Sequence, residues 1–260
     1  MTDLTFLAVG TGVRSRRIAY LQQPARVAGA PGFIWLQGLK SEMISTKATA
    51  LAAWCAEKGY ACTRFDYSGH GRSEGKFEDA VIGDWLEEAH AVLAQLTTGP
   101  QIVVGSSTGG YVALLLLRDL INQRRQDRIK ALTLIAPAWD MTEALMWQRF
   151  PESAKRDILE KGVYLRPSSY GDGPYAITRK FIEEGRQHLI GPTGFDPGVP
   201  VQVLHGLLDE DVPWEHTMDL EATLKGERVR VMAVPDGDHR LARPEDLDLL
   251  FRTLSELVAA

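Results

Sequence analysis

The chain has 260 residues, of which 45% are hydrophobic and 24% are charged, and its formal net charge is −5. This length and composition suit one globular α/β domain and leave little room for a second full domain. Lys and Arg residues are scattered along the chain and are outnumbered by acidic residues, so we do not expect a nucleic acid as a partner.

The apolar segments are too short to cross a membrane. The longest of them runs from Val112 to Leu117, far below the roughly 18 residues that a transmembrane helix needs. The first 20 residues lack the apolar stretch and small-residue cleavage site of a secretory leader. We therefore expect a cytoplasmic protein with no membrane span.

Short apolar segments that alternate with helical ones predict an α/β sheet. The expected strands are residues 4–9, 16–22, 32–37, 60–65, 101–105, 131–136, 200–205 and 229–235. Most of them are apolar throughout, which is typical of parallel strands buried on both faces. An amphipathic helix is expected at 81–96, and a final helix begins at Pro244. This alternation predicts a mainly parallel sheet of about eight strands with helices on both faces.

Residues 138–198 interrupt this alternation. About sixty residues there separate two predicted strands, and helical periodicity is present at 142–161 and 174–189. Ligands bind such sheets beyond the carboxyl ends of the strands, which is where this insert leaves the sheet. We therefore predict a small helical lid at 138–198 and a core domain formed by 1–137 and 199–260.

The segment GSSTG, residues 105–109, fits the pattern G-x-S-x-G in one register, with Ser107 at the centre. It follows a buried strand and precedes an apolar helix, as a nucleophile elbow requires. The N-terminus of that helix favours a developing oxyanion. Ser107 is the expected nucleophile, Ser106 is its neighbour, and the N–H of Thr108 is an expected oxyanion donor. The alternative is a Gly/Ser-rich turn that only caps the helix.

A serine nucleophile needs a general base and a carboxylate that orients the base. In enzymes with this elbow, the order along the chain is Ser, acid, His. His239, in DGDHRL, follows the last predicted strand and is the expected base. Asp209, in HGLLDEDVP, is the expected acid, with Asp211 and Asp140 as alternatives. His70, in YSGHGRSEG, precedes the serine and is interpreted as a loop or pocket-rim residue.

The second oxyanion donor is expected in the loop WLQGLKSEM, which follows the strand at 32–37. Gly38 allows a tight turn there, and the N–H of Leu39 is the predicted donor. At this place in the loop the commoner pair is His-Gly, whereas this chain has Gln37-Gly38. Because backbone N–H groups bind the oxyanion, we expect this difference to affect the orientation of the loop more than the chemistry.

An apolar and aromatic cluster lies at the start of the insert. Trp139, Met141, Met146 and Trp147 are predicted to line a pocket for a flexible acyl chain, because Met and aromatic side chains repack at low cost. The alternative is that this cluster belongs to the hydrophobic core. The two cysteines have no metal-binding spacing, and we expect neither a metal nor a cofactor.

The motifs RFDYSGHGRSEG, GPQIVVGSSTGG, LHGLLDEDVPW and DHRL together resemble those of the α/β-hydrolase superfamily. More narrowly, they resemble the palmitoyl-protein thioesterase subfamily that includes the mitochondrial acyl-glucuronide esterase. The similarity runs from about Arg16 to the C-terminus. It implies a lidded serine hydrolase of acyl esters and thioesters, with Ser107, Asp209 and His239 as its triad. No transit peptide is apparent, so the organelle is not carried over.

We expect, in sum, a serine hydrolase that cleaves acyl esters or thioesters through an acyl-enzyme on Ser107, with a small-molecule or acylated substrate. One alternative is a C–C bond hydrolase or perhydrolase that uses the same triad. Another is a non-catalytic binding protein of this fold. The presence of Ser, Asp and His in the required order argues against the last alternative.

Overall fold

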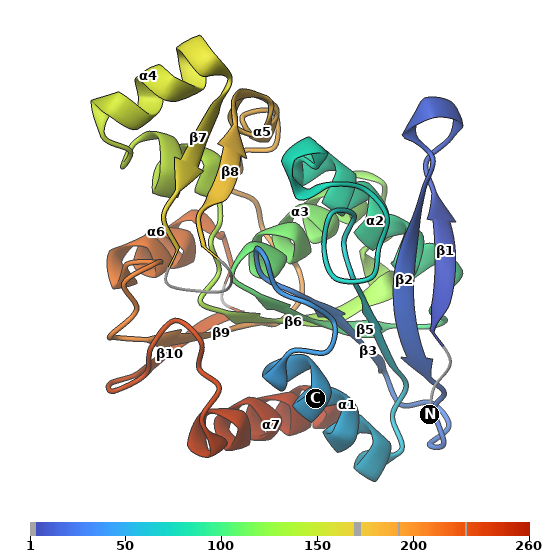
Figure 1. Cartoon of the computed structure of the whole chain (residues 1–260). Helices are drawn as coiled ribbons and strands as arrows, with labels where there is room; N and C mark the ends of the chain where they lie inside the picture. The colour runs from blue at the N-terminus through green and yellow to red at the C-terminus, as the bar shows by residue number, and fades with distance from the viewer. Residues whose placement is uncertain (1–3, 169–172, 192, 227) are drawn as a thin grey trace.

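Figure 1 shows the computed structural model of the chain, which describes residues 4–168, 173–191, 193–226 and 228–260. An eight-stranded sheet forms its centre. The strands are β1 Thr5–Val9, β2 Arg16–Gln23, β3 Gly32–Leu36, β4 Cys62–Phe65, β5 Gln101–Ser106, β6 Ile129–Ile135, β9 Val201–Gly206 and β10 Val229–Val234. Each of the eight predicted strands is confirmed to within about two residues.

The order across the sheet is β1-β2-β4-β3-β5-β6-β9-β10. Strand β2 is antiparallel to both of its neighbours, whereas the six strands from β4 to β10 pair in parallel. The prediction of a mainly parallel sheet is therefore confirmed. In such a sheet the loops that follow the parallel strands meet at one edge.

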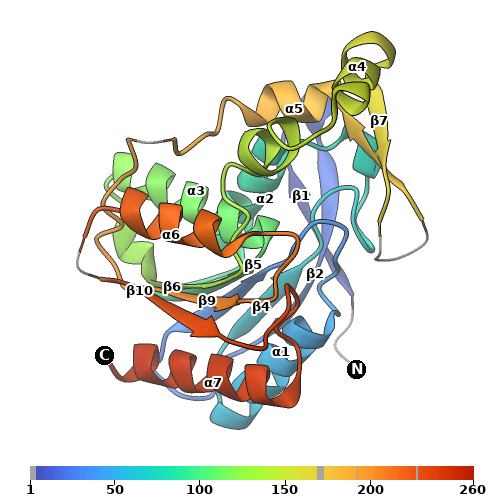
Figure 2. The same cartoon turned by 90° about the vertical axis from the view of Figure 1, so that its left-hand side faces the viewer.

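Helices cover both faces of the sheet, as Figure 2 shows. They are α1 Thr46–Lys58, α2 Ile82–Gln95, α3 Thr108–Asn122, α6 Trp214–Thr223 and α7 Pro244–Ala259. Helices α1 and α7 lie on one face, and α2, α3 and α6 lie on the other. Short 3₁₀ turns occupy Gly12–Arg14, Phe77–Asp79 and Gln126–Arg128. No helix in the described parts of the chain is long and apolar enough to cross a membrane.

Two apolar cores explain why the central strands are hydrophobic throughout. In β3, Ile34 and Leu36 pack into the core under α2 and α3, whereas Phe33 and Trp35 pack into the core under α1 and α7. Successive side chains of a strand point to opposite faces, so a strand covered on both sides has no polar face. These covered strands hold the loops of the site in fixed positions.

The insert at 138–198 is only partly helical. It contains a π-helical turn at Thr142–Trp147, then α4 Glu152–Lys161, and then a hairpin of β7 Val163–Arg166 and β8 Tyr175–Thr178 before α5 Arg179–Gly185. The helix predicted over 174–189 therefore begins as a strand. Tyr175, Ile177 and Thr178 are aromatic or β-branched, and such residues favour a strand over a helix. Residues 169–172 and 192 of this insert lie outside the described residues.

Candidate active site

Ser107 lies on the turn between β5 and α3 in a strained backbone conformation, with φ 54° and ψ −117°. Its N–H donates to the carbonyl oxygen of Ile135 at 2.8 Å, and its own carbonyl accepts from the N–H of Ala138 at 3.1 Å. A non-glycine residue with positive φ persists only where its surroundings hold it. The neighbouring strand β6 supplies that support, and the turn presents the Ser107 side chain at the sheet edge.

The glycines of the motif allow the strand and the helix to approach closely. A Cβ on Gly109 would lie 2.0 Å from the carbonyl oxygen of Leu36, and one on Gly105 would lie 2.4 Å from the carbonyl oxygen of Gly109. Neither position accepts a side chain without a shift of the backbone. The sequence GSSTG therefore forms the tight strand-to-helix turn that was predicted from it.

Ser107, His239 and Asp209 form one chain of hydrogen bonds. The Ser107 Oγ and His239 Nε2 are 3.1 Å apart, and His239 Nδ1 is 2.7 Å from Asp209 Oδ2. The Asp209 side chain is fully buried, and its other oxygen accepts the N–H groups of Asp211 and Val212 at 2.9 and 2.8 Å. Because an ionised carboxylate only accepts, His239 carries its proton on Nδ1 and turns the lone pair of Nε2 toward Ser107.

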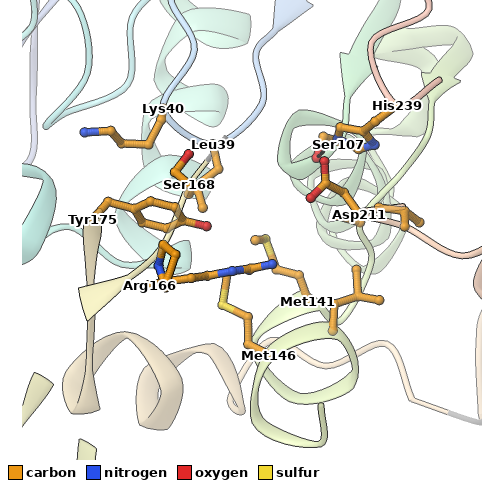
Figure 3. A pocket seen from close by; sticks show the side chains of 14 residues that line it. Leu39, Lys40, Ser107, Met141, Met146, Arg166, Ser168, Tyr175, Asp211 and His239 are labelled. Carbon is orange, nitrogen blue, oxygen red and sulfur yellow. Dashed lines mark hydrogen bonds between the residues drawn. The ribbon is translucent and has the colours of Figure 1, made fainter. Parts of the chain in front are cut away.

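The two alternative acids occupy other places. Asp140 is 6% exposed and accepts the N–H groups of Ile190 and Gly191 at 2.7 and 2.9 Å. Asp211 lines the cavity beside His239 (Figure 3). A nitrogen or oxygen atom from each of Asp209, Asp211 and His239 lies within 4.8 Å of the others, but both ring nitrogens of His239 are already engaged. A metal that used either ring nitrogen would have to break one of these two hydrogen bonds.

Both predicted oxyanion donors lie beside the nucleophile. Thr108 is the first residue of α3, and Leu39 lines the same cavity as Ser107. A Cβ on Gly38 would lie 3.3 Å from the Cβ of Ser107, so the absence of a side chain lets this loop approach the serine. The structure therefore brings two backbone segments, one from each side, to the nucleophile.

Asp66, which the sequence did not single out, and Gln37 hold these loops. Asp66 is 1% exposed, and its two carboxylate oxygens accept the N–H of Met43 at 2.7 Å and the N–H of Arg72 at 2.9 Å. Gln37, with both amide atoms paired, donates to Phe65 and accepts from Tyr67. Both contacts tie the loop after β3 to the segment after β4. The sequence feature that could have indicated Asp66 is the polar, glycine-rich segment directly after β4, the strand next to β3.

A half-buried lysine holds the loop that carries His239. Lys47, at the start of α1, donates from Nζ to the carbonyl oxygen of Arg240. Burial lowers the pKa of Lys47 to about 8, although Asp238 raises it in part. Asp238 also accepts the N–H groups of Arg240 and Leu241 at 3.0 and 3.1 Å. The loop on both sides of His239 is thus fixed by charge-assisted hydrogen bonds.

A cavity of about 200 Å³ opens at Ser107 and His239. Figure 3 shows that residues of the insert, among them Met141, Met146, Arg166 and Tyr175, line it opposite Ser107 and His239. Its apolar wall includes Leu39, Ala138, Met141, Leu145, Met146 and Val212. Its polar wall includes Lys40, Arg166, Tyr175 and Asp211. The predicted pocket residues Met141 and Met146 therefore lie in the same cavity as the nucleophile, together with charged groups that the prediction did not include.

The structure does not bring Trp139 and Trp147 to this cavity. Trp139 stacks on His216 with ring centroids 4.9 Å apart, donates to its carbonyl oxygen at 2.8 Å, and lines a separate hollow. The guanidinium carbon of Arg186 lies over the ring of Trp147, 5.0 Å from the centroid of that ring. Trp147 directly follows Met146 in the turn at 142–147, and adjacent residues of a helical turn point in different directions.

Comparison with known proteins identifies the family. A family described as "Serine aminopeptidase, S33" matches residues 37–169. A curated relative from Homo sapiens, "Palmitoyl-protein thioesterase ABHD10, mitochondrial", is 35% identical over 230 residues, which are 88% of this chain and 73% of the relative. The chain belongs to the α/β-hydrolase superfamily, in the subfamily of these palmitoyl-protein thioesterases. The predicted resemblance is therefore confirmed, and the chain is a hydrolase of the α/β type.

Solved structures of hydrolases agree with this assignment. A putative hydrolase from Agrobacterium vitis S4 is 37% identical, with a TM-score of 0.94 and coverage of 99% of both chains. Alpha/beta hydrolase domain-containing protein 10 from mouse is 31% identical, with a TM-score of 0.85 and coverage of 99% of this chain and 98% of that one. The predicted α/β-hydrolase fold is confirmed by both.

The predicted cytoplasmic location is contradicted by these relatives. The thioesterases from Homo sapiens and Mus musculus, at 35% and 34% identity, are named as mitochondrial proteins. The prediction depended on the lack of an apolar leader, and the lack of such a segment does not specify a compartment.

Proposed function

We propose that the chain is a serine hydrolase that cleaves acyl esters or thioesters through an acyl-enzyme on Ser107. The observation that carries this proposal is the chain of hydrogen bonds from Ser107 to His239, 3.1 Å, and from His239 to Asp209, 2.7 Å. These distances lie within the reach required for general-base activation of a serine.

The reaction begins when the Ser107 Oγ attacks the acyl carbonyl carbon and His239 Nε2 accepts its proton. The carbonyl oxygen becomes an oxyanion, which the N–H groups of Leu39 and Thr108 stabilise. The tetrahedral intermediate then collapses, and the imidazolium returns the proton to the departing alcohol or thiol. Water repeats the sequence on the acyl-enzyme, with His239 again as the base, and releases the carboxylic acid.

Asp209 supports both steps without changing its own protonation state. Its bond to Nδ1 holds the imidazole in the tautomer that has a lone pair on Nε2. Its charge stabilises the imidazolium when His239 accepts the proton. Because the carboxylate is buried and also receives two backbone N–H groups, it is fixed in position before the reaction starts.

The cavity supports an acyl substrate of limited length. Met141 and Met146 give it an apolar wall beside Ser107. Its volume of about 200 Å³ is smaller than the roughly 300–1,000 Å³ of pockets that enclose drug-sized ligands. An acyl chain of many carbons would therefore extend beyond the cavity or displace the insert. The thioester class is supported by the relatives named as palmitoyl-protein thioesterases.

We also propose that residues 138–198 act as a lid. The support is that this insert supplies Met141 and Met146 from its π-helical turn and Arg166 and Tyr175 from its hairpin to the cavity that contains Ser107. The nucleophile itself comes from the sheet. Substrate contacts and chemistry are then carried by different parts of the chain.

The test is labelling with a fluorophosphonate probe, peptide mapping, and turnover of p-nitrophenyl esters and acyl thioesters of increasing chain length. We expect an adduct on Ser107 and turnover of both classes. Labelling without ester or thioester turnover would favour a C–C bond hydrolase or a perhydrolase. A folded chain that is not labelled would indicate a non-catalytic binding protein.

A further inference from the structure

The loop that carries Leu39 contains a turn in a strained conformation. The N–H of Ser41 donates to the carbonyl oxygen of Gly38 at 3.1 Å, which closes a four-residue turn. Lys40, at the third position of the turn, has φ 58°. This is the geometry of a type II turn, which favours glycine at that position because its central peptide is rotated relative to the common type I turn. Something must hold the peptide between Leu39 and Lys40 in this orientation.

His70 contacts that peptide directly. Its Nε2 lies 3.1 Å from the backbone nitrogen of Lys40, and its Nδ1 lies 3.2 Å from the carbonyl oxygen of Ser68. A backbone N–H can only donate and a carbonyl can only accept, so Nε2 carries the lone pair and Nδ1 carries the proton. Only the neutral imidazole in this tautomer can make both bonds.

The surroundings of His70 keep it neutral. The side chain is 6% exposed and is enclosed edge-on by the rings of Tyr67, Phe77 and Trp85, at centroid distances of 6.1, 5.5 and 5.2 Å. The pKa of His70 is lowered to about 4, mainly by burial and in part by the charge of Lys40, against the opposing effect of the bond to Ser68. At neutral pH the acceptor on Nε2 is therefore always present.

The segment around His70 is anchored to the scaffold rather than to the substrate cavity. The N–H of Ser68 donates to Glu88 Oε2 at 3.0 Å, and the indole N–H of Trp85 donates to the carbonyl oxygen of Ser68 at 3.3 Å. Glu88 is fully buried in α2 and pairs with Arg16 of β2. A residue held this firmly from behind can transmit a fixed position to the loop in front of it.

We propose that His70 is a positioning residue for the oxyanion hole: its neutral imidazole accepts the N–H of Lys40 and so holds the turn in the conformation that directs the N–H of Leu39 toward Ser107. This inference rests on the proposed function, because it concerns the stabilisation of an oxyanion formed at Ser107. It assigns a role to the GHG segment that the triad does not use.

Such a role has a kinetic signature. A donor that binds the oxyanion acts mainly in the transition state, so its displacement lowers kcat and leaves KM almost unchanged. A misplacement of about 1 Å in an active site can cost roughly 10²-fold. A residue that only stabilised the fold would instead lower the melting temperature and the amount of active enzyme, with the kinetics of the folded fraction unaltered.

The test uses two variants of the full chain and one control. His70→Phe keeps the ring in the aromatic cluster but removes the acceptor, and His70→Gln retains an acceptor near the position of Nε2. Trp54→Phe, the control, removes packing from the core on the other face of the sheet, where Trp54 stacks on Phe251, without touching His70 or the turn. We expect kcat to fall about 10²-fold in His70→Phe, with KM changed by less than about threefold, and to recover at least about tenfold in His70→Gln. Trp54→Phe should lower the melting temperature but keep kcat within about threefold.

A second measurement does not depend on turnover. In a Ser107→Ala background, the Lys40 amide should be protected from hydrogen exchange, and the further change His70→Phe should remove that protection. Unchanged kcat in His70→Phe, equal losses in the Phe and Gln variants, or an unprotected Lys40 amide would each overturn the role of His70. A wild-type chain with neither labelling nor turnover would refute the proposed function and this role together, whereas an active wild type with an equally active His70→Phe refutes only the role of His70.

Discussion

The backbone N–H of Ser107 donates to the carbonyl oxygen of Ile135 at 2.8 Å. This bond extends the pairing of β5 and β6 by one residue into the turn, where Ser107 has φ 54°. The preceding residue, Ser106, is the last of β5 and is 7% exposed. The two adjacent serines therefore differ in backbone conformation and in access to the cavity.

We predict that Ser107→Ala abolishes probe labelling and lowers kcat by roughly 10⁴-fold or more, because the members of a triad act as a unit. Ser106→Ala should keep most of the activity, since its side chain is buried in the strand. Steady-state kinetics and peptide mapping on both variants check this. An adduct on Ser106, or an active Ser107→Ala, would contradict the assignment.

The identity of the acid is tested by a matched pair of variants. Asp209→Asn should leave the fold intact but lower kcat by a factor of order 10⁴, as in a well-studied triad enzyme, because the amide favours the wrong tautomer of His239. Asp211→Asn should have a much smaller effect, since Asp211 reaches Asp209 through its backbone N–H, which the substitution retains. If the Asp211 variant were the more impaired of the two, the acid would have to be reassigned.

The strands and the order of the triad residues could be predicted because they depend on local patterns. A strand buried on both faces must be apolar throughout, as in β3, and the turn at Ser107 needs glycines wherever a Cβ would meet backbone. Both requirements concern residues that are close together in the sequence. The sequence pattern therefore predicts the structure correctly at β3 and at the turn of Ser107.

The positions that could not be predicted depend on contacts between distant segments. Nothing in the sequence near His70 shows that its imidazole meets the N–H of Lys40, thirty positions earlier. Likewise, Trp147 directly follows Met146 in the sequence, but its ring packs against Arg186 and Lys155 rather than in the cavity. Local propensity is a weak constraint where tertiary contacts set the backbone.

The two halves of the predicted pocket cluster should respond differently to truncation. Met146→Ala should raise KM for longer acyl thioesters more than for acetyl esters, because Met146 lines the cavity at Ser107. Trp147→Ala should leave the chain-length profile unchanged, since its ring packs against Arg186 and Lys155 outside that cavity. Met146 is 1% exposed, so a loss of about 2–5 kcal/mol in stability is also expected. Melting temperatures measured with the kinetics separate the two effects, and a uniform loss on all substrates would remove Met146 from substrate recognition.

The buried His70 should also make the protein sensitive to acid. The pKa of His70 is about 4 in the folded chain, whereas its ordinary value is 6.5. At a pH between these two values, the unfolded chain therefore binds more protons than the folded one. The contribution of His70 to the free energy of unfolding is fully present above pH 6.5 and is lost as the pH falls toward 4. The difference corresponds to roughly 3 kcal/mol of unfolding free energy.

We therefore predict that His70→Phe reduces the fall in unfolding free energy between pH 7 and pH 4 by roughly 3 kcal/mol relative to the wild type. Burial also lowers the pKa values of His205 and His216, but both residues are present in both proteins, so their contributions cancel in the comparison. Urea denaturation followed by circular dichroism at several pH values measures the difference. Equal pH dependence in the two proteins would mean that His70 is accessible to protons in the folded chain, and hence that its ring is not held neutral against the N–H of Lys40.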